Sequence, residues 1–78
     1  MKTITLYTKP DCHLCHEAEH VLRALQQELL FELVLTDITQ DPELFERYHY
    51  DIPVVALDGV ELCRHRVDVD EVRRALTT

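Results

Sequence analysis

The residues of this 78-residue chain whose types and spacing could do chemistry are two cysteines three positions apart, Cys12 and Cys15. They follow a strand-like segment and a turn, and they open a segment with helical periodicity. Unpaired N–H groups and the positive dipole end of a helix start favour thiolate over thiol, and thiolate is the attacking species. We therefore predict that Cys12 attacks a disulfide and that Cys15 resolves the mixed intermediate by closing a small disulfide.

Charged neighbours act on this pair in opposite directions. Lys9, three residues upstream, could stabilise a thiolate at Cys12 or attract a carboxylate on a thiol substrate. A protonated His13 would act in the same sense, whereas the adjacent Asp11 opposes both. The sequence leaves the sign of the net effect open.

A second feature is the dipeptide Ile52-Pro53 at the head of an apolar run. Proline cannot donate to a sheet ladder, so it fits a central strand only at its start. The peptide bond before such a proline is a candidate for the cis form. If Pro53 packs beside Cys12, we expect the backbone of Ile52 to be free to pair with an extended substrate.

Hydrophobic periodicity and turn signals predict the elements that must position these residues. The predicted strands cover residues 3–8, 31–35, 53–57 and 60–64, and the predicted helices cover residues 13–29, 42–48 and the segment after 68. The first two strands should be parallel, with a right-handed crossover. Asp58-Gly59 predicts a hairpin between the last two. The fold class is α/β, with a β-α-β-α-β-β-α order, a four-stranded mixed sheet flanked by helices, and one domain over residues 1–78.

Several local features are predicted within these elements. Asp41 and Asp68 should cap the last two helices, with Glu71 as the capping partner of Asp68. The strand over 31–35 should be buried on both faces and followed by a loop over 36–40, and His49 should adopt a left-handed backbone. The long helix should bury one apolar stripe, made of Leu14, Ala18, Val21, Leu22, Leu25 and Leu29, and the last helix should turn to the core Val69, Val72, Ala75 and Leu76.

Composition excludes several function classes. A formal net charge of -7 argues against a nucleic-acid partner. The single glycine excludes the Gly-rich phosphate loops of nucleotide-binding proteins. No apolar stretch is long enough to cross a membrane, and the first residues lack the apolar block of a signal peptide. A cytoplasmic location is therefore expected.

The motifs carry a family resemblance. The segment Leu6–Cys15, together with Ile52-Pro53-Val54 and Gly59, resembles a glutaredoxin of the thioredoxin superfamily. More narrowly, small bacterial glutaredoxin-like proteins are similar over essentially the whole chain, through Cys-His-Leu-Cys, Glu17-Ala18, Asp37, Asp41-Pro42-Glu43-Leu44 and Tyr48.

The resemblance implies a small thiol–disulfide oxidoreductase active in electron transport, with Cys12 as nucleophile and Cys15 as resolving thiol. Pro53 would be a cis-proline that faces them, and Lys9 would lie near the carboxylate of glutathione. The implied substrate is a disulfide-bearing protein or a low-molecular-weight thiol, and a reductase or a thiol would supply the electrons. The protein is expected to be a monomer.

The chain departs from typical glutaredoxins at two places. His13-Leu14 stands between the cysteines, and residues 64–68 lack the glycines that let glutathione approach the backbone, so only Asp68 remains as an acceptor there. No cofactor is expected, and glutathione is considered only as a co-substrate without its usual binding mode. The candidate substrate groove consists of Lys9, His13, Leu14, Ile52, Pro53 and Asp68.

The cysteine, histidine and arginine residues also match other patterns. Cys12 to His16 matches a haem-attachment pattern, which conflicts with the predicted sheet and the absent export signal. A second close ligand pair for zinc is missing, so no metal is expected. The alternative function is a non-enzymatic binding module for a protein, a metal or an iron–sulfur cluster through the Cys pair. Cys63 is interpreted as a packing residue, the basic cluster Arg64-His65-Arg66 as a solvated strand end or an anchor for an acidic partner, and Tyr7 and Tyr48 as packing or site-flanking residues.

Overall fold

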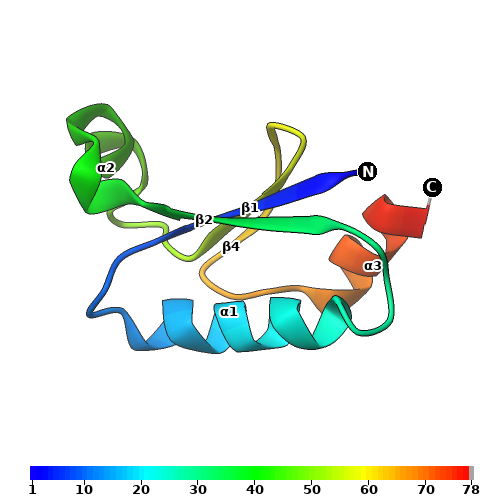
Figure 1. Ribbon diagram of the computed structural model, residues 1–78. Coiled ribbons are helices and arrows are strands. Elements are labelled where there is room, and N and C mark those ends of the chain that lie inside the picture. Colours follow the sequence, from blue (N-terminus) through cyan, green and yellow to red (C-terminus); the bar gives the residue numbers. More distant parts are fainter. Residues whose placement is uncertain (78) are drawn as a thin grey trace.

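The computed structural model describes residues 1–77, and within them four strands, three α-helices and one 3-10 helix follow the expected order (Figure 1). The strands are β1 (Thr3–Thr8), β2 (Glu32–Asp37), β3 (Val54–Leu57) and β4 (Val60–Arg64), and the helices are α1 (His13–Leu25), η1 (Ile38–Gln40), α2 (Pro42–Tyr48) and α3 (Val69–Thr77). The predicted α/β class is confirmed.

The strands form one mixed sheet in the order β2-β1-β3-β4. β1 pairs with β2 in parallel, and it pairs with β3 in antiparallel fashion with Tyr7 opposite Val54. In this register the last residues of β1 lie next to the first residues of β3, at one end of the two central strands. The chain segments that carry Cys12 and Pro53 therefore leave the sheet side by side.

The main core lies between one face of the sheet and helices α1 and α3, which lie on the same side in Figure 1. Alternation along β1 directs Ile4 and Leu6 to this face, where both are fully buried. They pack in one cluster with Leu22 of α1, Val55 of β3 and Val72 of α3. Apolar burial of this kind is the main force that holds α1 against the sheet.

Helix α2 lies on the other face of the sheet (Figure 1). Tyr7 points to this face, and its ring lies 4.7 Å from the ring of Tyr48 at the end of α2. Val54 and Ile38 are also fully buried. Tyr7 and Tyr48 thus have a packing role that fixes the end of α2 over the end of β1.

The predicted caps and hairpin are confirmed. Asp41 accepts hydrogen bonds from the N–H groups of Glu43 and Leu44, and Asp68 accepts one from the N–H of Glu71. In the hairpin, Asp58 and Gly59 have φ angles of 47° and 87°. These positive angles match the turn that suits the twist of two antiparallel strands.

The first helix is shorter than predicted. It ends at Leu25 rather than at residue 29, and the following turn is closed by hydrogen bonds such as that from the Leu29 N–H to the Leu25 carbonyl. Leu14 was expected in the core but is 50% exposed. It stands in the first turn of α1, where it lines a shallow surface groove opposite Val67 instead of meeting the sheet.

The second strand is also different from the prediction. β2 lies at the edge of the sheet, and Val34 and Leu35 are 44% and 39% exposed, so burial on both faces is wrong. The expected loop over residues 36–40 instead completes the strand and forms η1, which Asp37 caps through the Thr39 N–H. His49 has a right-handed φ of −60°, and the positive φ of 72° occurs at His65.

Cys63 is a half-buried residue of β4 that packs against the main core. Its register partner in β3 is Val55. Burial raises the pKa of the Cys63 thiol, because the uncharged form is favoured away from water. Burial therefore favours the uncharged, less reactive form of this thiol.

A substitution in the main core tests the packing. Leu22→Ala should lower the free energy of unfolding by about 2–5 kcal/mol, because a fully buried leucine leaves a cavity when it is truncated. Val60→Ala is the matched control at a residue that is 66% exposed, and it should change stability by less than about 0.5 kcal/mol. Urea denaturation measures both, and equal effects would contradict the assigned core.

The raised pKa of Cys63 predicts slow alkylation. In the oxidised protein, iodoacetamide at a pH of about 8.5 should modify Cys63 at least about fivefold more slowly than in the urea-unfolded chain, because less thiolate is present. The ratio of the alkylation rates in the unfolded and folded protein should decrease as the pH rises. The pKa of Cys63 is higher in the folded than in the unfolded protein. Its contribution to the free energy of unfolding is therefore present at neutral and acid pH and decreases as the pH rises into the alkaline range. Equal alkylation rates in the two states would contradict the burial of this thiol.

Candidate active site

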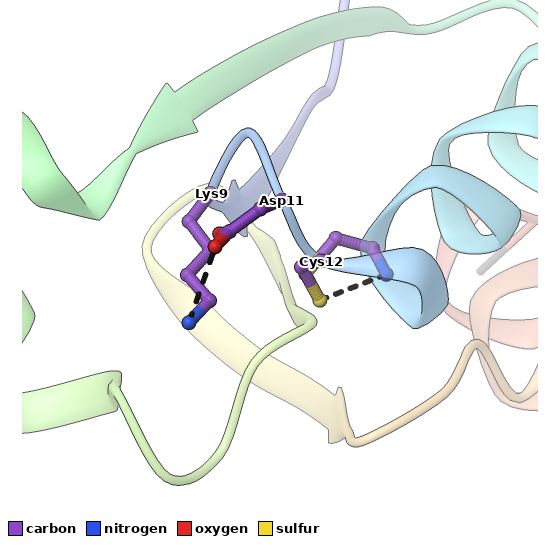
Figure 2. Close-up of a disulfide and its surroundings, with 4 residues drawn as sticks. Lys9, Asp11 and Cys12 are labelled. Atoms are coloured by element: carbon purple, nitrogen blue, oxygen red, sulfur yellow. Dashed lines mark hydrogen bonds and ion pairs between the residues drawn. A yellow bond between two sulfur atoms is a disulfide. The ribbon is translucent and has the colours of Figure 1, made fainter.

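Cys12 and Cys15 are joined by a disulfide at the start of α1, with their Cα atoms 5.2 Å apart. Cys12 is the N-cap of the helix, with φ −102° and ψ 108°. Its Sγ accepts a hydrogen bond of 3.1 Å from the backbone N–H of Cys15 (Figure 2). The sulfur thus takes the position that a serine or aspartate oxygen usually occupies at a helix start.

The turn that leads to Cys12 explains why the cap forms there. The Cys12 N–H donates to the Lys9 carbonyl at 3.3 Å, and Pro10 stands within the turn. The His16 N–H then donates to the Cys12 carbonyl at 3.1 Å, which is the first hydrogen bond of the helix. The chain changes from strand to helix within four residues, and the change places both sulfurs at the helix N-terminus.

The two cysteines differ in their access to solvent. Cys15 is fully buried, whereas Cys12 is only partly buried. Cys12 is therefore the cysteine of the pair that has access to solvent.

The charged residues near the cysteines pair locally. The Lys9 ammonium lies 3.8 Å from the Asp11 carboxylate, which in Figure 2 is directed toward Lys9. The His13 ring lies 3.4 Å from the Glu17 carboxylate one helical turn later. Ion pairs at the protein surface contribute little to stability, so these contacts are weak constraints on the side chains of Lys9 and His13.

The segment 49–53 leads into β3, whose start pairs with the end of β1, and Figure 2 shows the ribbon of this part of the chain near Cys12. The Ile52–Pro53 peptide bond is cis, and Pro53 is fully buried. The Ile52 N–H donates to the Tyr48 carbonyl at 3.1 Å. The expectation that the backbone of Ile52 is free is therefore wrong for its N–H group, because this group closes the turn after α2.

Two hollows lie near the start of α3. A cavity of about 380 Å³ is bordered by residues 66–70, and a smaller groove of about 120 Å³ runs between α1 and the segment before α3. Arg66 and Val67 border both, and Leu14 lies at the smaller groove. The Asp68 carboxylate, expected as a ligand acceptor, is held by the Glu71 N–H as a helix cap.

Within the basic cluster at residues 64–66, Arg64 is engaged in ion pairs with residues of the same chain. Arg64 contacts the carboxylates of Asp51, at 3.1 Å, and Glu61, at 2.7 Å, so it is not a free anchor for a partner. The pairing of Asp51 with Arg64 was not expected from the sequence. An acid three residues before β3 and a base at the end of its hairpin partner, opposite Val54, were the available signal.

Residues 1–77 contain no group of three or more His, Cys, Asp or Glu side chains placed to hold a metal ion. None of their helices is long and apolar enough to cross a membrane.

Comparisons with known proteins give a consistent family. The model of the glutaredoxin-like domain (DUF836) matches residues 3–77. The "glutaredoxin-like protein YDR286C homolog" of Dictyostelium discoideum is 26% identical, over 96% of this chain and 75% of that protein.

Solved structures agree with the family. Protein Ne2328 from Nitrosomonas europaea is 31% identical with a TM-score of 0.86, over 96% of this chain and 91% of that one. Protein XcR50 from X. campestris is 33% identical with a TM-score of 0.70, over 95% of each chain. A Halobacterium salinarum thioredoxin, 18% identical over 96% of this chain and 71% of that one, shares the fold with a TM-score of 0.69. With its family model, its sheet order and its Cys pair at the start of α1, the chain belongs to the glutaredoxin-like family of the thioredoxin superfamily.

Proposed function

We propose that the protein is a thiol–disulfide oxidoreductase that uses Cys12 as nucleophile and Cys15 as resolving thiol. The observation that carries the proposal is the contrast between a partly exposed Cys12 and a fully buried Cys15 at one helix N-terminus. Membership of the glutaredoxin-like family supports it. The cytoplasm, where thiol couples are kept reduced, is the proposed location.

The reaction begins with the reduced pair. The Cys12 thiolate attacks one sulfur of the substrate disulfide, forms a mixed disulfide and releases the other substrate sulfur as a thiolate, which takes up a proton. The Cys15 thiol then loses its proton and attacks the sulfur of Cys12. This step forms the Cys12–Cys15 disulfide and releases the second substrate thiol, so two electrons have passed to the substrate.

The Cys15 N–H group supports the first step. It points at the Sγ of Cys12, at 3.1 Å. A thiolate is a stronger hydrogen-bond acceptor than a thiol, so this donor and the helix dipole favour the reactive form. The sulfur that a substrate can reach is therefore the sulfur that the helix start activates.

The proposed substrate is a disulfide in a protein or a low-molecular-weight disulfide, bound across Lys9, His13, Leu14, Ile52, Pro53 and Asp68. A second thiol or a reductase returns the two electrons to the Cys12–Cys15 disulfide. Glutathione is a candidate donor, but two features count against its usual binding mode. Asp68 is engaged as a helix cap, and exposed Arg66 stands where a glycine would let the tripeptide approach.

The binding-module alternative has less support. A metal held by the Cys pair would need further ligands, and residues 1–77 place no suitable group of three. We therefore propose the redox function alone.

Replacing either cysteine tests the proposal. Cys12→Ser should lower the rate of insulin-disulfide reduction at least about a hundredfold, because a serine hydroxyl is far less ionised than a thiol. Cys15→Ser should retain the first step and accumulate a mixed disulfide with the substrate, which mass spectrometry of the intact protein would detect.

The matched control is Cys63→Ser, which changes a thiol outside the pair and should keep wild-type activity. Full activity in Cys12→Ser, or loss of activity in Cys63→Ser equal to that in Cys12→Ser, would contradict the assigned roles.

A further inference from the structure

We propose that Asp51, through its ion pair with Arg64, is a positioning residue for substrate binding at the thiol pair. It fixes the segment 49–53, which lies beside Cys12, against the end of β4. The inference rests on the proposed redox function and adds a residue that directly contacts neither sulfur.

Asp51 uses both its backbone and its side chain to connect three elements. Its N–H donates to the Tyr48 carbonyl at 2.7 Å, and its carbonyl accepts from the His65 N–H at 3.1 Å. Its carboxylate lies 3.1 Å from an Arg64 guanidinium nitrogen and 4.0 Å from the His65 ring. The end of α2, the segment before β3 and the end of β4 thus meet at one residue.

The backbone of the same segment is attached at a second point. The His65 N–H also donates to the Pro53 carbonyl, at 2.8 Å. His65 has a positive φ of 72°, so the chain changes direction at this residue, directly after β4. The Asp51–Arg64 ion pair adds a side-chain link to these backbone bonds, between the segment and the end of β4.

The consequence for the active site follows from the sheet register. Tyr7 lies opposite Val54, so residues 51–53 stand at the end of β1 from which the chain continues to Cys12. An extended substrate that reaches Cys12 must lie against this segment. A segment that moves would lose contact with the substrate backbone, although the thiols themselves would be unchanged.

The ion pair is partly protected from water. The Asp51 side chain is only 26% exposed, and the Arg64 side chain 45%. Arg64 is held from its other side by Glu61, at 2.7 Å, so its guanidinium is already oriented toward Asp51. The ion pair of Glu28 with Arg73, at 2.6 Å, joins the turn after α1 to α3 and involves none of these residues, which makes Glu28 a matched control.

The test compares two substrates. Reduced protein, freed of reductant, is mixed with excess insulin or with bis(2-hydroxyethyl) disulfide, and oxidation of the Cys pair is followed over substrate concentration. Asp51→Ala should lower the apparent second-order rate with insulin about three- to tenfold, through weaker binding, the scale of a partly exposed ion pair. The rate with the small disulfide, which has no peptide backbone, should stay within about twofold.

Three further variants sharpen the test. Arg64→Met keeps the aliphatic stem and should reproduce the defect with insulin, and the double variant Asp51→Ala/Arg64→Met should be no worse than either single one. Glu28→Ala, which removes an ion pair elsewhere in the fold, should behave as the wild type. Amide hydrogen exchange of Ile52 should be faster in Asp51→Ala, because its bond to Tyr48 closes the same turn.

Separate outcomes overturn the inference and the proposed function. The inference alone is overturned if both substrates oxidise the wild-type protein but folded Asp51→Ala or Arg64→Met reacts with insulin at the wild-type rate. An equal loss with both substrates also overturns it, because the effect would then lie in the thiols. A wild-type protein that neither substrate oxidises overturns the proposed function and this inference with it.

Discussion

The structure depends on one local constraint, the change from strand to helix that makes Cys12 the N-cap of α1. The hydrogen bond from the Cys15 N–H to the Cys12 sulfur completes the helix start, and in the proposed function it also favours the thiolate form of that sulfur. Burial of α1 on the sheet through Leu22 then fixes Cys15 in the interior and leaves Cys12 at the surface. The start of α1 thus stabilises the helix and also makes the two cysteines differ in burial.

Much of the fold could be predicted from the sequence, because its signals are local. The Asp58-Gly59 turn, the Asp41 and Asp68 caps and the alternation in β1 each depend on neighbouring residues alone. The errors concern features that need the tertiary arrangement. The apolar run before residue 36 does not show that β2 is an edge strand, and the helical spacing of Leu14 does not show that the first turn of α1 extends past the sheet.

The candidate site divides in the same way. The Cys pair and its place at a helix start could be predicted from spacing, and Pro53 from its place at the head of an apolar run. The bond from the Ile52 N–H to Tyr48 and the ion pair of Asp51 with Arg64 join residues from different elements. Their charges were visible in the sequence, but their partners depend on how the turn after α2 meets the end of β4.

The most direct test of the central claim is a redox titration of the Cys12–Cys15 pair against dithiothreitol buffers, with alkylation and mass spectrometry as the readout. The account predicts a reversible two-electron transition with a midpoint between about −270 and −120 mV, the range of catalytic dithiol couples. A midpoint below about −300 mV, as structural disulfides typically show, or a pair that is not reduced reversibly in the folded protein, would contradict it.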